Sequence, residues 1–420
     1  MNFLSILQQK KEGKEIASAD LKQVVEAYVR KEIPDYQMSA FLMAICFRGM
    51  SMQELSAWTL AMVESGRRLN LKSLKNPKID KHSTGGVGDK VSLILAPWVA
   101  CFDILVPMMA GRSLGFTGGT IDKLESIPGF QACLSESQIL KNLQKVGCCI
   151  FSQSEKIATA DHQLYALRDA SGTVESIPLI ASSIVSKKVA EGIDGIVYDV
   201  KFGAGAFLPE LQQARELATA LVNLSRTLGL KSQALLTSME QPLGYAIGNS
   251  LEVLECVEVM KGKPVQDLLE VSLALAAKML VLAKRANNTR EAHLKLKKVL
   301  KSGAVYQKFL EMIRAQKGEV HFVQSIQKRL SKMQCVSIFA AKKGYVSSIA
   351  TRAMADYLRE VGAGRFQKSD SIEADVGIIL NKKLGDFVRK GDLLFQCYLR
   401  KNEKNKMALS HFYKINSHQN

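Results

Sequence analysis

Two glycine-rich loops, one on either side of an apolar run, constrain the fold of this chain more than any other feature. The first loop covers residues 80–89 and the second covers residues 117–125, and both combine glycines with Ser or Thr. Because glycine has no Cβ, consecutive backbone N–H groups can converge on one tetrahedral anion, and the hydroxyls add further donors. Lys81 adds a positive charge to the first loop. Together the loops predict a site for an oxyanion such as phosphate.

Each loop has a simpler interpretation when it is taken alone. Gly85 to Gly88 could form only a tight turn, and no Gly-Lys-Ser/Thr run follows at the spacing that a Walker A loop requires. The recurrence of the same chemistry in a second loop therefore favours a shared anion site over two unrelated turns.

Length and composition place the chain among folded, soluble proteins. With 420 residues and 47% hydrophobic content it can bury a large core, and we expect two or three domains. The longest apolar stretches, at residues 91–106 and 271–283, are interrupted by polar residues, and no secretory signal is visible. We therefore expect a cytoplasmic protein without a membrane partner. The eight cysteines lack metal-ligand spacing, which indicates free thiols.

The formal net charge of +17 suits either a nucleic-acid binder or an enzyme that acts on anionic substrates. Most Lys and Arg residues are spread among predicted helices, and no zinc-finger, RNP or basic-zipper pattern surrounds them. This distribution favours the enzyme and predicts no nucleic-acid partner. We interpret the basic stretch at residues 400–406 as a solvated or frayed end.

Hydrophobic periodicity predicts an α/β fold with a helical domain, a larger α/β domain with a mostly parallel sheet, and a small C-terminal α+β unit. Ser51 and Glu54 have capping-box spacing, and the apolar run 41–45 packs either inside the subunit or against a second one. Residues 91–95 and 195–200 have the texture of buried strands. We place the helical domain at 1–68 and 155–192, the α/β domain at 69–154 and 193–334, and the C-terminal unit at 335–420.

Several dispersed motifs resemble those of the thymidine and pyrimidine-nucleoside phosphorylases of the second nucleoside phosphorylase family. The resemblance extends from the N-terminal helices to about residue 395 and includes residues 33–40 and 362–365. Its motifs are long and therefore specific: they are residues 80–89, 111–112, 117–125, 164–169 and 199–201.

This resemblance implies a homodimer in which phosphate attacks C1′ of a pyrimidine nucleoside and releases the free base and an α-pentose 1-phosphate. It implies that phosphate is held at the positions of Lys81, His82, Ser83, Ser92, Met108, Met109, Ala110 and Thr120. It also implies that Arg168, Ser183 and Lys187 hold the pyrimidine, with His82, Arg168 and Lys187 as the catalytic residues.

The assigned roles agree with the chemistry of the reaction. Cleavage of the N-glycosidic bond leaves negative charge on the departing ring, which Arg168 and Lys187 can stabilise. Ser183 and Lys187 share a face if residues 182–189 are helical, although each cation could instead form an ordinary surface ion pair. His82 either orients the base or shuttles a proton, or it is only a packing residue. Phosphate is already a nucleophile, so no catalytic triad or metal-bound water is required.

The chain departs from the family pattern at residues 108–116, just before the second loop. Ala110 replaces a serine whose hydroxyl contacts phosphate, and Met108 and Phe116 are apolar where the family has Lys and His. The loss of one hydrogen bond to a charged group costs roughly 1.5–3 kcal/mol, which would weaken phosphate binding without abolishing it. Ser113 compensates if its hydroxyl reaches the anion.

A second departure concerns a monovalent cation such as potassium. In the family, backbone oxygens and a carboxylate can hold it at positions that correspond to Gly88, Leu243, Ala246 and Glu255, but Lys90 stands where a hydroxyl residue is usual. An ammonium group could take the place of the cation, or Lys90 could point to solvent. We expect no required cofactor.

Two other functions stay open at this point. One is a phosphoribosyltransferase of related architecture, and the other is a degenerate phosphorylase that binds nucleosides or serves as a scaffold. The sequence does not separate a preference for thymidine from one for uridine.

Overall fold

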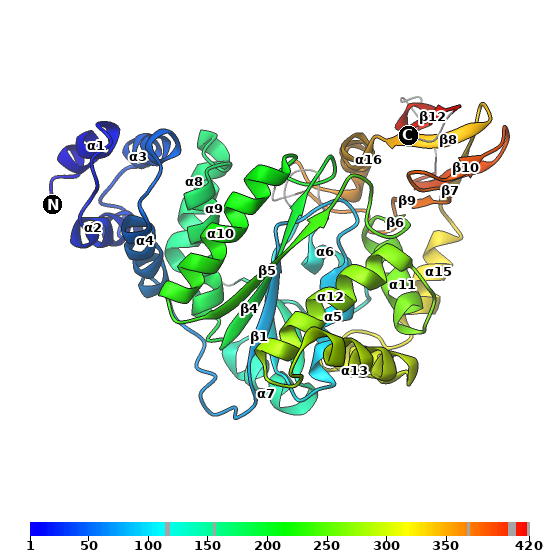
Figure 1. Ribbon diagram of the computed structural model, residues 1–420, viewed down its shortest axis with the longest axis horizontal. Helices are drawn as coiled ribbons and strands as arrows, with labels where there is room; N and C mark the ends of the chain where they lie inside the picture. Colours follow the sequence, from blue (N-terminus) through cyan, green and yellow to red (C-terminus); the bar gives the residue numbers. More distant parts are fainter. Residues whose placement is uncertain (114–117, 154–156, 368–369, 402–408, 418–420) are drawn as a thin grey trace.

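The computed structural model describes residues 1–113, 118–153, 157–367, 370–401 and 409–417. Figure 1 shows an elongated molecule with the N-terminal helices at one end, the C-terminal strands at the other and the parallel strands between them. Phe116 and most of the basic stretch up to Lys406 lie outside the described residues. No helix in the described ranges is long and apolar enough to cross a membrane. The cytoplasmic location stays a prediction.

Four helices form the N-terminal end, as the sequence predicts. The capping box of Ser51 and Glu54 is present at the start of α4, and Gly49 ends α3. Within the run 41–45, Phe41, Leu42 and Ile45 are fully buried, so this apolar face packs inside the subunit. The bounds are α1 (Phe3–Lys11), α2 (Ser18–Val29), α3 (Asp35–Arg48) and α4 (Met52–Glu64).

Two later helices pack against this N-terminal group. Ala160 and Leu164 of α8 (Thr159–Ser171) and Leu179 of α9 (Ile177–Ala190) share one hydrophobic core with α1 to α4. The predicted domain boundaries themselves stay a prediction.

Parallel strands form the centre of the molecule, which confirms the predicted fold class. Strand β4 (Gly195–Phe202) lies between β1 (Ile79–Ser83) and β5 (Lys231–Ser238), and β2 (Val106–Ala110) pairs with β3 (Cys148–Ser152). A parallel bridge between Lys78 and Leu105 joins the two groups of strands. Strand β1 ends at Ser83, within the first glycine-rich loop, and β2 ends at Ala110, seven residues before the second. Ligands of open α/β sheets bind beyond such carboxyl ends.

The predicted strand at residues 91–95 is wrong, because these residues begin helix α5 (Val91–Ala100). Apart from Ser92, every residue of α5 is buried. A helix that is apolar on all sides lacks the period of 3.6 that identifies a surface helix, and a short apolar run then resembles a buried strand.

Helices α10 and α12 pack against β4 and β5, and α7 packs against β2 and β3, while α15 lies beside the C-terminal strands (Figure 1). The prediction of a helix at residues 212–228 is confirmed by α10. The bounds are α6 (Thr120–Glu125), α7 (Glu136–Val146), α10 (Leu211–Thr227), α11 (Asn249–Met260), α12 (Gln266–Leu282), α13 (Thr289–Lys301), α14 (Ala304–Ala315) and α15 (Phe322–Leu330).

The C-terminal unit contains two antiparallel sheets with strand orders β6-β9-β11-β7 and β10-β8-β12. Strand β6 (Ala246–Ile247) precedes α11, so the first sheet includes a strand from the α/β part of the chain. The remaining elements are β7 (Gln334–Phe339), β8 (Gly344–Ile349), α16 (Thr351–Leu358), η1 (Arg359–Ala363), β9 (Gly377–Leu380), β10 (Phe387–Val388), β11 (Leu393–Leu399), η2 (Leu409–Phe412) and β12 (Tyr413–Asn416).

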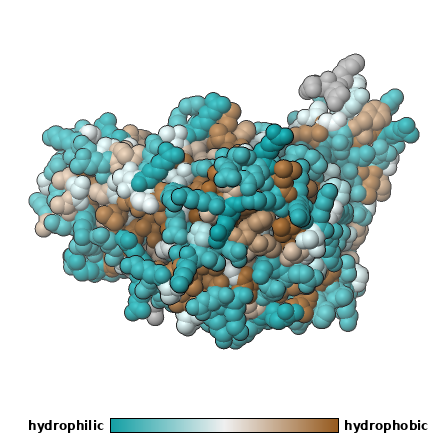
Figure 2. All heavy atoms as spheres, turned by 60° about the horizontal axis from the view of Figure 1, so that its bottom comes forward, coloured by the Kyte–Doolittle hydropathy of each residue, from teal (hydrophilic) through white to brown (hydrophobic). Residues whose placement is uncertain are grey.

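The face drawn in Figure 2 is covered mostly by hydrophilic residues, and hydrophobic residues gather there in separate patches. This surface agrees with a chain in which 23% of the residues are charged.

Candidate functional site

The first glycine-rich loop connects β1 to α5 and turns sharply at its last glycine. Gly88 has a φ of 77°, in the region that favours glycine, and a Cβ there would lie 2.8 Å from the carbonyl oxygen of Leu243. The loop therefore has to carry glycine at this position, since the 243–246 segment packs directly against it.

Three of the predicted phosphate residues lie close together around this loop. Lys81 Nζ is 3.3 Å from Ser92 Oγ and 3.7 Å from Asp199 Oδ2, and the Lys81 side chain is fully buried. Ser83 Oγ accepts a hydrogen bond from the N–H of Gly85 and donates one of 2.5 Å to Asp89 Oδ2. The loop is thus held by hydrogen bonds before any anion arrives.

Buried charges under the loop compensate one another. Lys201 Nζ lies 3.0 Å from Asp199 and 4.0 Å from Asp89. Burial alone would raise the pKa of Asp89, but Lys201, Lys81 and Lys123 outweigh it and hold that pKa well below its usual range. Asp89 is therefore ionised at neutral pH.

The second loop lies against the first, as the sequence predicts. Lys123 Nζ donates to the backbone carbonyls of Asp89, at 2.6 Å, and Gly118, at 3.2 Å. Thr120 is the first residue of α6, lies between Gly118 and Lys123 in the sequence, and is partly buried. The two loops therefore meet at Lys123, and Ser83 is tied to the same Asp89 through its hydroxyl.

Strand β2 brings no polar side chain to this region. Met108 is 1% exposed and belongs to the main hydrophobic core, and Met109 is also buried. Ala110 is partly buried at the end of the strand. Ser113 Oγ accepts a 3.3 Å hydrogen bond from Arg365 Nη1, so this hydroxyl already has a partner within the chain.

His82 is influenced by the charges of both clusters, through Lys81 of the phosphate cluster and Lys187 of the pyrimidine cluster. Burial is the main cause that holds the pKa of His82 well below its ordinary value of 6.5, and the charges of Lys188, Lys187 and Lys81 add to it. The imidazole is therefore neutral at pH 7, and it can accept or donate a hydrogen bond without carrying positive charge.

The predicted pyrimidine residues gather on α8 and α9. Residues 182–189 are helical, and Lys187 Nζ lies 2.8 Å from Ser183 Oγ, one turn away, which confirms that they share a face. Lys187 also forms a 2.6 Å ion pair with Asp161, whose carboxylate is almost fully buried, and it lies over the ring of Tyr165. The pair is enclosed rather than a surface ion pair.

Arg168 is held by backbone carbonyls and forms no ion pair in the part of the chain that the structure describes. Its guanidinium donates to the carbonyls of Thr173, Val174 and Leu179 at 3.2, 2.7 and 2.9 Å. The residue is 3% exposed and its burial lowers the pKa of the guanidinium. The alternative of an ordinary surface ion pair is wrong for Arg168.

The sequence analysis missed a buried lysine that joins this helix to the sheet. Lys188 Nζ donates to Asp80 at 2.7 Å, to Glu191 at 2.6 Å and to the carbonyl of Met109 at 3.0 Å. Asp80 lies on β1 and Met109 on β2, so α9 is fixed to both strands and the pyrimidine cluster is fixed relative to the loops. The available signal was Asp80, a charge at the start of an otherwise buried strand.

Lys90 occupies the position that the resemblance assigns to a cation. Its Nζ donates to the carbonyls of Leu243 at 2.7 Å and Ala246 at 2.8 Å and to Glu255 at 2.6 Å. Burial would lower the pKa of Lys90, but Glu255 and Glu252 outweigh it and the pKa lies above its ordinary value. The alternative that Lys90 points to solvent is wrong, because its side chain is fully buried.

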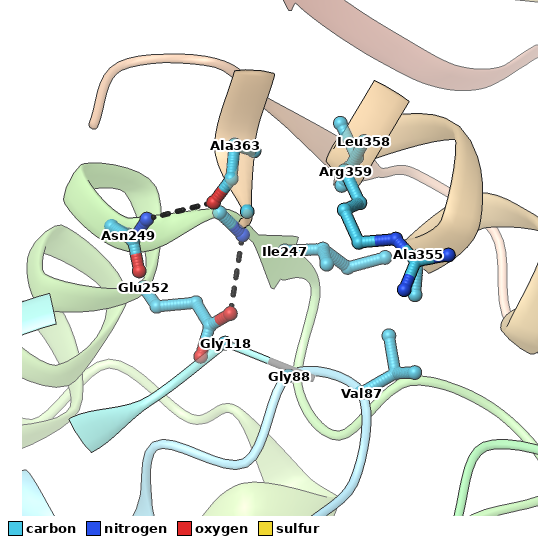
Figure 3. A pocket seen from close by; sticks show the side chains of 12 residues that line it. Val87, Gly88, Gly118, Ile247, Asn249, Glu252, Ala355, Leu358, Arg359 and Ala363 are labelled. Atoms are coloured by element: carbon cyan, nitrogen blue, oxygen red, sulfur yellow. Dashed lines mark hydrogen bonds between the residues drawn. The ribbon is translucent and has the colours of Figure 1, made fainter. Parts of the chain in front are cut away.

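A separate pocket lies behind the loops, between them and the C-terminal unit. Val87 and Gly118 line one side and Leu358 and Arg359 the other, and Glu252 accepts a hydrogen bond from Gly248 at its edge (Figure 3). The phosphate and pyrimidine clusters described above do not line this pocket.

Comparisons with known proteins cover nearly the whole chain. Residues 4–66 match the helical bundle domain and residues 75–306 the a/b domain of the glycosyl transferase family, and residues 345–417 match the pyrimidine nucleoside phosphorylase C-terminal domain.

Curated relatives are similar at moderate identity. The chain is 44% identical over 398 residues to the pyrimidine-nucleoside phosphorylase of Bacillus subtilis, which covers 95% of this chain and 92% of that protein. It is 42% identical over 403 residues to the enzyme of the same name from Geobacillus stearothermophilus, with 96% and 93% covered.

A solved structure shares the fold at low sequence identity. The anthranilate phosphoribosyltransferase of Thermus thermophilus matches with a TM-score of 0.59 and 16% identity over 74% of this chain and 99% of that one. This likeness concerns the fold alone.

Proposed function

Because this chain belongs to the pyrimidine-nucleoside phosphorylases of the glycosyl transferase family, we propose that it catalyses the phosphorolysis of pyrimidine nucleosides. Inorganic phosphate attacks C1′ of the nucleoside, the N-glycosidic bond breaks, and the products are the free base and an α-pentose 1-phosphate. The observation that carries the proposal is that, in addition to burial, ammonium groups of both polar clusters, Lys81 and Lys187, lower the pKa of the same residue, His82. The chain is also 42% identical to such an enzyme over 96% of its length.

Phosphate binds, in this proposal, where the two glycine-rich loops meet. Lys81, Ser83, Ser92 and Thr120 are the residues that hold it, together with loop amides. Lys81 is already compensated by Asp199, so hydroxyl and amide donors supply much of the affinity. Met108, Met109 and Ala110 contribute only the strand backbone and shape, because they carry no polar side-chain atom.

The pyrimidine binds next to Arg168, Ser183 and Lys187. As the glycosidic bond breaks, negative charge spreads onto the ring oxygens, and cations placed there stabilise the transition state more than the ground state. Tyr165 lies beside both cations, within 5.9 Å of Arg168 and 5.8 Å of Lys187, and helps to fix them. His82 is neutral and orients the nucleoside through a hydrogen bond.

A phosphorolysis assay tests the proposal directly. Thymidine, deoxyuridine, uridine and cytidine are each incubated with and without phosphate, and the released base is measured. We expect base release from at least one nucleoside only when phosphate is present. Nucleoside binding by calorimetry without turnover would indicate a degenerate phosphorylase that only binds nucleosides. Turnover that needs a 5-phosphoribosyl diphosphate instead would indicate a phosphoribosyltransferase.

No metal cofactor belongs to this proposal, since the described residues around Lys90 do not fit a bound potassium ion. The ammonium is within 2.6–2.8 Å of the three oxygens from Leu243, Ala246 and Glu255. Lys90 thus supplies the positive charge that a potassium ion would bring.

The comparison of wild-type protein with Lys90→Thr tests this role of Lys90 without relying on activity. Melting temperatures are measured in potassium chloride and in choline chloride at the same ionic strength. The wild type should melt alike in both salts, while the variant should be stabilised by potassium. A wild type that needs potassium for stability or activity would overturn the replacement.

We also propose that the chain forms a homodimer through its N-terminal helices. Tyr36 and Phe47 of α3 are 74% and 82% exposed, and Leu4 of α1 is 59% exposed. These helices lie together at one end of the molecule (Figure 1), and exposed aromatic side chains are typical of subunit interfaces. Sedimentation of the wild type and of Phe47→Asp tests it: a dimer should become a monomer.

A further inference from the structure

Lys123 occupies a position that none of the assigned roles explains. Its side chain is 1% exposed, and its Nζ has three oxygen neighbours from three different segments. It donates to the carbonyl of Asp89 at 2.6 Å, to the carbonyl of Gly118 at 3.2 Å, and lies 3.0 Å from Glu252 Oε2 on α11. Asp89 ends the first glycine-rich loop and Gly118 belongs to the second.

These contacts fix the distance between the two loops. An ammonium has three donors in roughly tetrahedral directions, so one Nζ can donate to two carbonyls while its charge pairs with a nearby carboxylate. Asp89 is tied to Ser83 through its side chain, which accepts a hydrogen bond from the hydroxyl of Ser83, and Gly118 lies two residues before Thr120. A change in their separation therefore moves Thr120 relative to Ser83, and a tetrahedral anion that must contact both loses hydrogen bonds.

Helix α11 supplies the negative charge of Glu252, which allows the ammonium of Lys123 to be buried between the loops. Glu252 is 2% exposed, and its Oε1 accepts from the N–H of Gly248. Figure 3 shows Glu252 directed toward the loop at Gly118. Without a carboxylate, a buried ammonium would be strongly disfavoured.

We propose that Lys123 is a positioning residue for phosphate: it joins both glycine-rich loops and sets their spacing to fit a tetrahedral dianion. The inference rests on the proposed phosphorolysis only for its ligand, inorganic phosphate. We assign Lys123 no contact with the anion: its Nζ donates to the two loop carbonyls and forms an ion pair with Glu252.

The test compares three proteins. In Lys123→Met/Glu252→Gln the ammonium and its carboxylate are removed together, so no charge is left buried without a partner. The matched control is Lys10→Met/Glu54→Gln, because Lys10 and Glu54 form another buried pair at 2.7 Å, between the N-terminal helices and away from the loops. Phosphate binding is measured by calorimetry, and the KM values for phosphate and nucleoside are measured separately.

We expect the Lys123 double variant to bind phosphate at least tenfold more weakly and to show a matching rise in the phosphate KM, with a nucleoside KM within twofold of the wild type. The Lys10 double variant should lose thermal stability but keep both KM values. Phosphate affinity within twofold of the wild type in the Lys123 double variant would overturn the inference, as would an equal rise in both KM values.

If that variant does not fold, Lys123→Gln takes its place, since its shorter, uncharged side chain cannot reproduce the contacts of the ammonium with both carbonyls and Glu252. The same two results decide. Calorimetry with phosphate requires no turnover. A wild type that binds phosphate but releases no base would therefore contradict the proposed reaction and leave this inference to be judged on its own result.

Discussion

The two halves of the site treat positive charge differently. Under the glycine-rich loops, the buried lysines have carboxylate partners: Lys81 and Lys201 share Asp199, and Lys123 faces Glu252. In the pyrimidine half, Arg168 has only backbone carbonyls as hydrogen-bond partners among the described residues. The proposed phosphate half therefore offers mainly hydrogen-bond geometry, whereas the proposed pyrimidine half keeps, in Arg168, a charge that has no ion-pair partner among the described residues. This difference suits a reaction whose nucleophile arrives already charged and whose leaving group becomes charged only in the transition state.

The strongest test of this contrast is Arg168→Met. Loss of the uncompensated charge should lower kcat/KM by roughly 10³-fold, in the upper range for removal of one preorganised donor to a developing anion. Steady-state kinetics with thymidine or uridine measure it, and circular dichroism checks that the variant is folded. Arg168→Lys should lose less, because it keeps the charge. A fall below threefold in the Met variant would show that the charge is not used.

Lys187→Met should have the next largest effect. Because Asp161 already compensates this ammonium at 2.6 Å, we expect a smaller loss of kcat/KM than for Arg168, about 10²-fold. The same assay measures it. Equal losses for the two variants would remove the distinction between a compensated and an uncompensated cation.

Ala110→Ser tests the phosphate half, where geometry should matter more than charge. A serine there adds one donor to a charged ligand, worth roughly 1.5–3 kcal/mol, and the phosphate KM should fall about tenfold. The nucleoside KM serves as the internal control and should not move. An unchanged phosphate KM would mean that no anion oxygen lies within reach of this position.

The smallest predicted effect concerns pH and His82. Its pKa in the folded protein lies well below 6.5, so between about pH 6.5 and 5.5 the unfolded chain binds a proton that the folded protein does not. The free energy of unfolding therefore falls as pH drops, by at most about 1.4 kcal/mol per pH unit from this group.

His82→Asn should remove this contribution and make the loss of stability shallower. Melting temperatures at pH 7.5 and 5.5 measure it, with His321→Asn, at an exposed position, as the control. The carboxylate of Asp89 is ionised in both states over this range and does not contribute. Parallel losses in wild type and the His82 variant would contradict the depressed pKa.

The sequence predicted what depends on local pattern. The capping box at Ser51, the shared face of Ser183 and Lys187 and the adjacency of the two glycine-rich loops follow from short-range spacing and turn chemistry, and all three are present. The strand predicted at residues 91–95 failed because a helix buried on all sides has no polar face to reveal its period.

The buried charges could not be predicted in the same way. Lys123 and Glu252, or Lys188 and Asp80, are far apart along the chain and meet only through the arrangement of the sheet and its helices. Nothing in a single sequence pairs one lysine with one carboxylate among many. The three oxygens that surround the ammonium of Lys90 could be predicted only because the family resemblance gave their positions.

Strand β6 links the C-terminal unit to the α/β part of the protein, because it pairs with β9. The short segment 242–247 supplies carbonyls to Lys90, accepts hydrogen bonds from Lys383 at Pro242 and Gly244, and pairs with β9. A truncation that removes β7 and every residue after it would also remove β9. The backbone amides of β6 would then lose their partners, and the segment that packs against Gly88 would be held less firmly. The C-terminal unit therefore stabilises the first glycine-rich loop, which lies far earlier in the sequence, and removal of this unit should impair the folding of that loop.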